Sequence, residues 1–378
     1  MNSDERISAN ATDSPVDWSP VERVVLIRLR SIGDTVLMTP CLTALKAWRS
    51  NVEISVICEP LAAPLLEGHP LVDKLIVAGT STASRLATIA RLRKSRFDIA
   101  FNMHGGSTGS ILARLSGARY SIGYAGLPLA RMLTHRAPSP DVILGRAHIH
   151  SVEQQLALLK WSGMPWPKAP RLRLVVSLEI MAKIRERLAA QPGMKWKEAY
   201  PSGYACVAPG AALESKRWSA EGFAAVADHL KQRWNLSTVV IAGPGQERLA
   251  NEVAFAARHK AAVLSGLSLK ELIALLQLAC VFVGNDSGPM HIASALDRPV
   301  VAVWGSSNPT VWHPWTEAPW RIVGGEAWNR EAASGRGGNP AIREIPPAEV
   351  IAAVDEVLEP ALEANHKAGW RAVYTERA

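Results

Sequence analysis

The sequence predicts an α/β protein built on two parallel β-sheets, and three observations favour this fold class. Apolar, strand-like runs alternate with helix-like segments along most of the chain, which is typical of βαβ units. A Pro-rich passage at 164–170 interrupts the alternation, which then resumes. The length of 378 residues exceeds what one ordinary hydrophobic core accommodates, so two domains are expected.

In the first half, strands are expected at the apolar runs and helices in the segments between them. The strands are Val24–Leu29, Glu53–Cys58, Ile76–Ala78 and Asp98–Asn102, and the helices are Asp34–Trp48, Leu61–Glu67, Arg85–Lys94 and Gly109–Ser116. Residues 1–20 are polar and lack an apolar core, so they are interpreted as a disordered arm rather than a secretory signal. The first domain is then expected at 21–175.

The second half repeats the pattern after an expected helix at Leu178–Ala190. Its strands are Tyr204–Ala208, Ser237–Ala242, Ala262–Leu264, Val281–Val283 and Val300–Trp304, and its helices are Ser219–Trp234, Glu247–Arg258, Leu269–Leu278 and Pro347–Leu358. The second domain is expected at 176–345, with a closing helix and tail at 346–378. We expect a cleft between the two sheets, because ligands of such sheets bind at the carboxyl ends of the strands.

Composition is typical of a globular protein of the cytoplasm. Asp, Lys or Arg interrupts every apolar run before it reaches the length of a membrane span. The four cysteines lie far apart in apolar segments and form no CxxC or Cys/His cluster. They are Cys41, Cys58, Cys206 and Cys280, and they are expected to be buried structural thiols.

The formal net charge of +8 is unevenly distributed. Nine basic residues and one acid, Asp98, lie between Ser81 and Arg136. The basic residues are Arg85, Arg91, Arg93, Lys94, Arg96, Arg114, Arg119, Arg131 and Arg136. They form either a solvated face or a docking surface for an anionic partner, such as a membrane surface or a phosphorylated acceptor. No motif in the chain supports binding of nucleic acid.

The most informative motif is Gly284–His291, between the apolar run Cys280–Val283 and a helix-like segment. Pro289 fits the first turn of a helix that Ser287 or Gly288 can cap. Such a helix start offers free N–H groups and the positive end of the helix dipole. The motif therefore predicts an anion site, first of all for a diphosphate, and His291 is either a ligand there or a satisfied helix histidine.

Two other loops follow strand ends in the second half. The loop after the first strand carries the adjacent cations Lys216 and Arg217, which are either phosphate ligands or solvated residues. The loop Ala242–Glu247 contains Gly243, which permits either the close approach of a ligand or a plain turn.

The loop Arg28–Thr35 has one glycine, so it is neither a GxGxxG fingerprint nor a P-loop. Asp34 falls where a helix N-cap belongs, and it is either that cap or a catalytic carboxylate kept ionised by the helix dipole. No DxD pair follows a strand and no His/Asp cluster has metal spacing. We therefore expect no metal and no cofactor, with backbone amides and Lys216 balancing the charge of a bound diphosphate.

A combined pattern extends over three segments of the chain, which are Ile27–Asp34, Pro209–Trp218 and Asp286–Ala293. This pattern resembles glycosyltransferase family 9. These enzymes are the ADP-heptose:lipopolysaccharide heptosyltransferases and their relatives. Further segments fit the same family, namely Leu112–Ala118, Ile122–Tyr124, His150 with Gln154–Leu159, and Val303–Pro309. The similarity runs from about Arg23 to Leu358, and the order and spacing of so many segments make it specific.

The resemblance implies a GT-B fold, in which two Rossmann-like domains hold the acceptor and the nucleotide-sugar. It also implies an inverting, metal-independent transfer. By matching position, Asp34 would be the general base, Lys216 would bind the donor's phosphate or sugar, and Asp286 would contact the sugar hydroxyls. Ser287 and Gly288 would hold the diphosphate, supported by His291.

Further donor contacts are expected at Pro209, Gly210, Gly243 and Met290, and acceptor contacts at Arg30, His104 and Arg119. The sequence departs from the family where some members carry an acidic residue for the ribose, because this chain has Pro244-Gly245 there. The segment Trp312–Thr316 also departs from the family, and it either reshapes the donor site or packs.

The leading hypothesis is an inverting glycosyltransferase that moves a sugar, heptose from ADP-heptose, onto a lipopolysaccharide core or related cell-surface acceptor. The enzyme would work in the cytoplasm, in peripheral contact with the inner face of the membrane. A nucleotide-sugar epimerase and a non-catalytic nucleotide-sugar-binding protein remain as alternatives. A dehydrogenase is the weakest, because no GxGxxG follows either lead strand.

Overall fold

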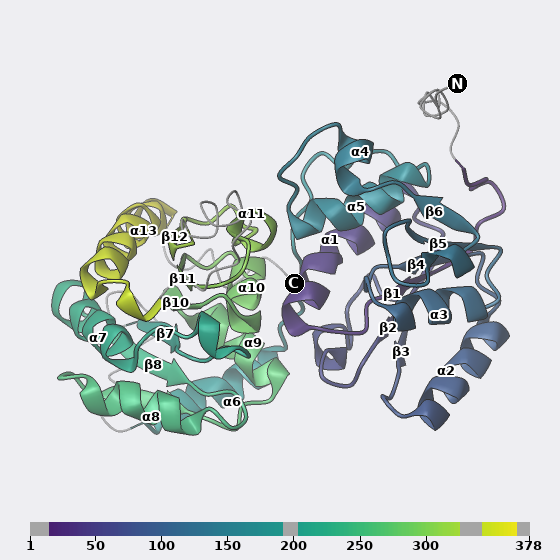
Figure 1. Cartoon of the computed structure of the whole chain (residues 1–378). Coiled ribbons are helices and arrows are strands. Elements are labelled where there is room, and N and C mark those ends of the chain that lie inside the picture. The colour runs from purple at the N-terminus through teal and green to yellow at the C-terminus, as the bar shows by residue number, and fades with distance from the viewer. Residues whose placement is uncertain (1–14, 192–202, 326–341, 369–378) are drawn as a thin grey trace. The chain divides into compact units, whose positions relative to one another are not determined.

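The computed structural model describes residues 15–191, 203–325 and 342–368, with side chains described up to residue 361. Its contacts divide the chain into two compact units (Figure 1). The first unit comprises the described residues up to Arg30 together with Met38–Pro170. The second comprises the described residues from Arg171 onward together with Ser31–Leu37. The expected disordered arm lies mostly outside the described residues, and so do the turn region at 192–202 and the end of the tail.

The first unit is built on a six-stranded sheet in the order β3-β2-β1-β4-β5-β6, and all its pairs are parallel. Its strands are β1 (Arg23–Ile27), β2 (Glu53–Cys58), β3 (Lys74–Val77), β4 (Ile99–Asn102), β5 (Tyr120–Tyr124) and β6 (His135–Ala137). Its helices are α1 (Ile32–Trp48, the first turn of which groups with the second unit), α2 (Thr82–Ser95), α3 (Ser107–Leu115), α4 (Pro140–Leu144) and α5 (Ser151–Trp161). Buried apolar residues of β1, α2 and α3 form one core cluster on one face of this sheet.

The second unit has a sheet of the same design, in the order β12-β11-β10-β7-β8-β9, again with parallel pairs only. Its strands are β7 (Tyr204–Ala208), β8 (Ser237–Ile241), β9 (Ala261–Leu264), β10 (Val281–Asn285), β11 (Val300–Trp304) and β12 (Trp320–Gly324). Its helices are α6 (Leu178–Ala189), α7 (Ala220–Trp234), α8 (Glu247–Ala256), α9 (Leu269–Leu278), α10 (Gly288–Ala295), α11 (Pro309–Trp312) and α13 (Pro347–Ala368).

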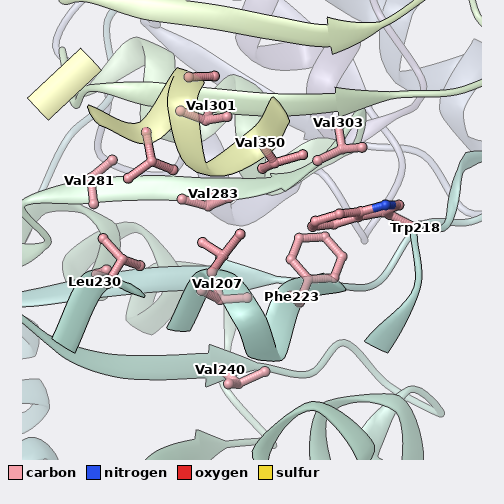
Figure 2. Close-up of a cluster of buried hydrophobic side chains, with 14 of the residues drawn as sticks. Val207, Trp218, Phe223, Leu230, Val240, Val281, Val283, Val301, Val303 and Val350 are labelled. Carbon is pink, nitrogen blue, oxygen red and sulfur yellow. The ribbon is translucent and has the colours of Figure 1, made fainter. Parts of the chain in front are cut away.

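The core of the second unit shows why valine-rich runs form its central strands. Figure 2 shows Val207, Val240, Val283 and Val303 of four neighbouring strands, with Trp218 and Phe223 against them. Apolar residues of α7, α8 and α13 complete this layer. Strands covered by helices are buried along their whole length, which is why they read as continuous apolar runs.

The prediction of an α/β protein with two parallel sheets is confirmed. The sequence missed three strands, β5, β6 and β12, and all three lie toward the edges of their sheets. Edge strands such as His135–Ala137 carry exposed polar residues, so they lack the apolar run that marks a central strand. The expected helix Leu61–Glu67 is a short 3-10 turn at Ala63–Leu65. Proline is tolerated only in the first turn of a helix, so Pro64 disfavours a helix that begins as early as Leu61.

The cysteines are buried and unpaired, as predicted. Burial raises the pKa of the Cys280 thiol to about 11 and that of Cys58 to about 12, so both remain protonated at neutral pH. Across the described residues, no helix combines the length and the apolar character that crossing a membrane would require.

Candidate active site

The chemistry-bearing residues of the second unit lie at the carboxyl ends of β7, β8, β10 and β11. Asn285 is the last residue of β10, and the buried Asp286 follows it directly. The loop after β7 carries Lys216, and the loop after β11 carries Ser306 and Ser307. In a doubly wound sheet this edge is where ligands bind.

Lys216 and Asp286 form the central ion pair of this edge. The distance from Lys216 Nζ to Asp286 Oδ2 is 2.6 Å, and the two side chains are 22% and 5% exposed. The hydroxyl of Ser307 donates a second, short hydrogen bond to the same carboxylate oxygen. The two residues that the sequence assigned to donor binding are therefore in direct contact, and Ser307 joins them.

The loops after β7 and β11 pack closely together beside this ion pair. The hydroxyls of Ser215 and Ser306 are 2.8 Å apart and share a hydrogen bond. A Cβ added at Gly305 would lie 2.3 Å from the carbonyl oxygen of Ser215. Only glycine fits there, because the two loop backbones approach each other so closely.

Asn285 joins both ends of the loop that carries Lys216. Its Nδ2 donates to the Pro209 carbonyl at 2.7 Å, and its Oδ1 accepts from the Trp218 amide at 3.1 Å. Within the loop, Arg217 Nε donates to the Ala211 carbonyl at 2.8 Å. The interpretation of Arg217 as a phosphate ligand therefore finds no support in its placement, because its guanidinium group folds back on its own loop.

Helix α10 begins as the sequence predicted, with Ser287 as the N-cap and Pro289 in the first turn. No side-chain hydrogen bond caps this helix start, because the Ser287 hydroxyl donates to the Asn285 carbonyl instead. Pro289 has no amide hydrogen and the Met290 amide donates to the Ser287 carbonyl at 3.1 Å, so the Gly288 amide is the donor of the first turn that is left without a side-chain cap. This arrangement has the geometry of an anion site.

His291 is buried within α10 at 5% exposure. Burial lowers the pKa of His291 below its ordinary value, although the carboxylates of Asp286 and Asp34 act in the opposite direction. The Lys216 cation lowers that pKa further. His291 therefore lies within electrostatic reach of three other predicted site residues, and it is neutral at neutral pH.

The first turn of α1 packs against α10 through two glycines. A Cβ added at Gly33 would lie 2.5 Å from Cδ2 of His291, and one added at Gly288 would lie 3.0 Å from Ile32 Cγ2. Each glycine thus leaves space for a side chain of the other helix. This contact explains why Ser31–Leu37 groups with the second unit.

Asp34 lies at the third position of α1, so its interpretation as the N-cap is wrong. The preceding Ser31 takes the cap position, and its amide and hydroxyl both donate to Asp34 Oδ2 at 3.1 Å. Asp34 therefore plays the part of the acidic residue in a capping box. This half-buried carboxylate is held in a fixed place by its own helix turn.

Gln246 links the loop after β8 to the loop after β7. Its Nε2 donates to the Ala211 carbonyl at 3.1 Å, and its Oε1 would lie 2.0 Å from a Cβ at Gly210 and 3.1 Å from one at Gly243. The end of the Gln246 side chain fills the space beside both glycines, and it would have to move if either position carried a side chain. The absence of side chains at these positions has a packing reason in this structure.

The three predicted acceptor residues lie in the first unit. Arg30 is exposed, and the guanidinium group of Arg119 lies 5.0 Å above the ring of Tyr120. The amide of His104 donates to Asn102 Oδ1 at 3.1 Å. Of the nine basic residues of 81–136, all but Arg85 are exposed.

The Trp-rich segment after β11 is part of the packing of the second unit. The ring of His313 stacks on Trp320 with centroids 5.2 Å apart, and it also stacks on Trp315 at 6.3 Å. Asn308 caps the short helix α11 by accepting from the Thr310 amide. Between the two interpretations of this segment, the structure favours packing.

Sequence reasoning missed three residues of this edge, which are Asn285, Ser307 and Gln246. Asn285 lies inside the motif Gly284–His291 and Ser307 inside the family segment Val303–Pro309, so a polar residue just after an apolar strand-like run was a usable signal. Gln246 offered no signal, because its contacts are with backbone groups 35 residues away. Among the described residues, no three His, Cys, Asp or Glu side chains cluster as metal ligands.

Comparisons with known proteins agree on one family. The model of glycosyltransferase family 9 (heptosyltransferase) matches residues 85–333. Lipopolysaccharide heptosyltransferase 3 of Escherichia coli is 26% identical over 350 residues, which cover 87% of this chain and 97% of that protein.

Two solved structures resemble the fold. One is a glycosyl transferase family 9 protein of Veillonella parvula, with a TM-score of 0.77 and 24% identity over 92% of this chain and 99% of that chain. The other is the E. coli ADP-heptose lipopolysaccharide heptosyltransferase II, with a TM-score of 0.73 and 22% identity over 91% and 99% of the two chains. The expected GT-B architecture of two Rossmann-like domains is thereby confirmed.

Proposed function

Because the chain belongs to glycosyltransferase family 9 and is a glycosyltransferase, we propose that it transfers heptose from ADP-heptose to a lipopolysaccharide core acceptor. The ion pair between Lys216 and Asp286, next to the open start of α10, is the observation that carries this proposal. A cation, a carboxylate and the uncapped Gly288 amide at the carboxyl edge of the sheet support the binding of a sugar diphosphate there. The names of the relatives supply the sugar and the acceptor.

In the proposed mechanism, Asp34 is the general base. An acceptor hydroxyl attacks the anomeric carbon of the donor, the bond from that carbon to the diphosphate oxygen breaks, and the hydroxyl proton passes to the Asp34 carboxylate. Attack from the face opposite the leaving group inverts the anomeric configuration. A positioned base contributes about 10²–10⁴-fold to such a step.

The leaving diphosphate gains negative charge as the sugar departs. We assign its stabilisation to Lys216, to the Gly288 amide at the start of α10, and to the hydroxyl of Ser287, which would turn from the Asn285 carbonyl to the diphosphate. One lost donor of this type typically costs about 10²–10³ in rate. Asp286 would then contact the sugar hydroxyls while it keeps Lys216 in place.

No divalent ion is needed in this mechanism, because a lysine and backbone amides carry the charge of the diphosphate. The exposed basic residues of 81–136 are proposed to attract a phosphorylated acceptor at the inner face of the cytoplasmic membrane. Arg30, His104 and Arg119 remain the candidate acceptor contacts in the first unit.

Mass spectrometry of reaction products tests this function. The enzyme is incubated with ADP-heptose and with ADP-glucose, UDP-glucose or GDP-mannose, each in the presence of a panel of lipid-core acceptors. We expect a mass increase of one heptose on one acceptor, and the same rate when EDTA is present. Transfer of a different sugar would contradict the proposal that ADP-heptose is the donor. Loss of activity in EDTA would contradict the metal-independent mechanism.

A second reaction, without acceptor, separates transfer from epimerisation. A transferase leaves the stereochemistry of the donor unchanged when no acceptor hydroxyl is available. Nuclear magnetic resonance of the recovered ADP-heptose measures this directly. A changed configuration of the sugar would support an epimerase in place of a transferase.

A further inference from the structure

Asn285 and Asn102 occupy equivalent positions in the two sheets. Each is the last residue of the strand beside the lead strand, which is β10 beside β7 in the second unit and β4 beside β1 in the first. Both side chains are buried, at 0% and 1% exposure. The two asparagines thus offer a natural comparison between one unit and the other.

Asn285 holds the loop Pro209–Trp218 at both of its ends. The carboxamide donates to the first residue of this loop at 2.7 Å and accepts from the last residue at 3.1 Å. Lys216 lies within the loop, and its Nζ is 2.6 Å from the carboxylate of Asp286, the residue after Asn285. One strand end therefore fixes both the loop and the cation that the loop presents.

The contacts require a carboxamide rather than any polar side chain of that size. The Pro209 carbonyl needs a donor and the Trp218 amide needs an acceptor, and both partners are buried. A carboxylate at residue 285 can accept from Trp218, but it turns a second acceptor toward the Pro209 oxygen. Leaving a buried polar group without a hydrogen-bond partner costs free energy. Replacing the asparagine with aspartate therefore weakens the contacts that hold the ends of the loop together.

Asn102 makes the same type of contacts with different partners. Its Oδ1 accepts from the His104 amide at 3.1 Å, and its Nδ2 donates to Ser110 Oγ at 3.1 Å. A Cβ at Gly109 would lie 2.1 Å from Asn102 Oδ1, so the asparagine also fixes the start of α3. Its partners His104 and Ser110 both belong to the first unit.

We propose that Asn285 is a positioning residue for the nucleotide-sugar donor. It holds the two ends of the loop Pro209–Trp218 together and so keeps Lys216 in the position that binds the donor. It touches no donor atom itself, because its side chain is fully buried and both of its polar atoms have protein partners. This inference rests on the proposed function, because the donor is the ligand that Lys216 is proposed to bind.

Amide hydrogen exchange tests the closure of the loop without any ligand. In the ligand-free protein, Asn285→Ser removes both contacts while it introduces no buried charge. We expect exchange in peptides covering 210–218 to rise by about tenfold or more, with no change in peptides covering β8. Unchanged exchange in 210–218 would overturn the inference, whatever the enzyme binds.

Binding of ADP, measured by calorimetry, tests the link to the donor. At pH 7.5 we expect Asn285→Ser and Asn285→Asp each to weaken ADP binding by about tenfold or more. As the pH is lowered toward 5, the aspartate variant should recover affinity relative to wild type, because its protonated carboxyl can again donate to the Pro209 carbonyl. The serine variant has no such group, so the ratio of its ADP affinity to that of the wild type should not change with pH.

Asn102→Asp is the matched control, because it makes the same substitution at the equivalent strand end of the other unit. We expect its ADP affinity to stay within about twofold of wild type. Equal loss in Asn102→Asp and Asn285→Asp, or a normal ADP affinity of Asn285→Ser with a loosened loop, would contradict the positioning role. Failure of the wild-type chain to bind ADP, with the exchange result as expected, would instead contradict the proposed donor.

Discussion

Lys216 and Asp286 are 70 residues apart in the sequence, yet their charged atoms are 2.6 Å apart at the edge of the second sheet. The pair is largely buried, so removing one partner leaves the other charge without compensation. The same two residues are proposed to bind the donor. Their structural and functional contributions can therefore be separated by experiment.

Lys216→Met is expected to lower both stability and activity. The isolated Asp286 carboxylate should cost about 3 kcal/mol in the free energy of unfolding, and the lost cation about 10²–10³ in kcat/KM. The double variant Lys216→Met/Asp286→Leu should recover stability in denaturant melts while it remains inactive. Recovery of activity together with stability would show that Lys216 has no role beyond folding.

Asp34→Asn is expected to abolish most transfer while donor binding persists. An asparagine keeps the shape of the side chain and can still accept from Ser31, but it cannot take a proton from the acceptor. We expect kcat to fall by about 10²–10⁴ with an unchanged affinity for ADP. Asp141→Asn, in the first turn of α4, is the control and should leave kcat as in wild type.

Gly33→Ala is expected to disturb the contact between the first turns of α1 and α10. The added Cβ would lie 2.5 Å from the ring of His291, and such overpacking typically costs about 1–3 kcal/mol of stability. Thermal melts should show this loss, and the smaller residue in Gly33→Ala/His291→Ser should reverse it. Gly126→Ala is the control, because nothing lies within 4 Å of its added Cβ.

His291 is expected to make the stability of the protein depend on pH. Burial lowers the pKa of His291 in the folded state below the ordinary value of 6.5, so the unfolded chain binds a proton that the folded chain does not. Stability should therefore fall as the pH falls below 6.5, by up to about 1.4 kcal/mol per pH unit. Denaturant melts of His291→Gln should show a shallower slope in this range, and parallel curves would contradict the prediction.

Acceptor binding is expected to weaken with salt. If the exposed basic residues of 81–136 attract a phosphorylated acceptor, the KM for that acceptor should rise between 50 and 300 mM NaCl, where the Debye length falls to several ångströms. The variant Arg93→Gln/Lys94→Gln/Arg96→Gln should have a higher acceptor KM than the wild type at 50 mM NaCl, and its KM should rise less with added salt. An acceptor KM that is independent of salt in the wild-type enzyme would remove this role from the basic region.

Most of the fold could be predicted because helices cover the central strands on both faces. Runs such as Val281–Val283 and Val300–Trp304 are apolar throughout for that reason, and they were found. The strands His135–Ala137 and Trp320–Gly324 contain polar residues at positions open to solvent, so their sequence carries no comparable signal. The sequence also misplaced the cap of α1, because both Ser31 and Asp34 are good caps and only the backbone distinguishes them.

The candidate site could be predicted in part. Lys216 and His291 were singled out from motifs at strand ends and Asp286 through the family resemblance, and the structure brings the three together. The contacts of Asn285 with Pro209 and Trp218 join residues that are 76 and 67 positions apart, so no local sequence pattern predicts them. Their existence depends on β7 and β10 being neighbours, which is a property of the completed sheet.

The grouping of Ser31–Leu37 with the second unit has a consequence for biosynthesis. The first sheet is complete once β6 has been made, so a nascent chain can form it long before α10 leaves the ribosome. The turn that carries Asp34 acquires its partners, Gly288 and His291, only after most of the protein has been translated. A chain that ends prematurely can therefore have a folded first domain and still lack the residues of α10 that pack against the helix turn of its proposed base, Asp34.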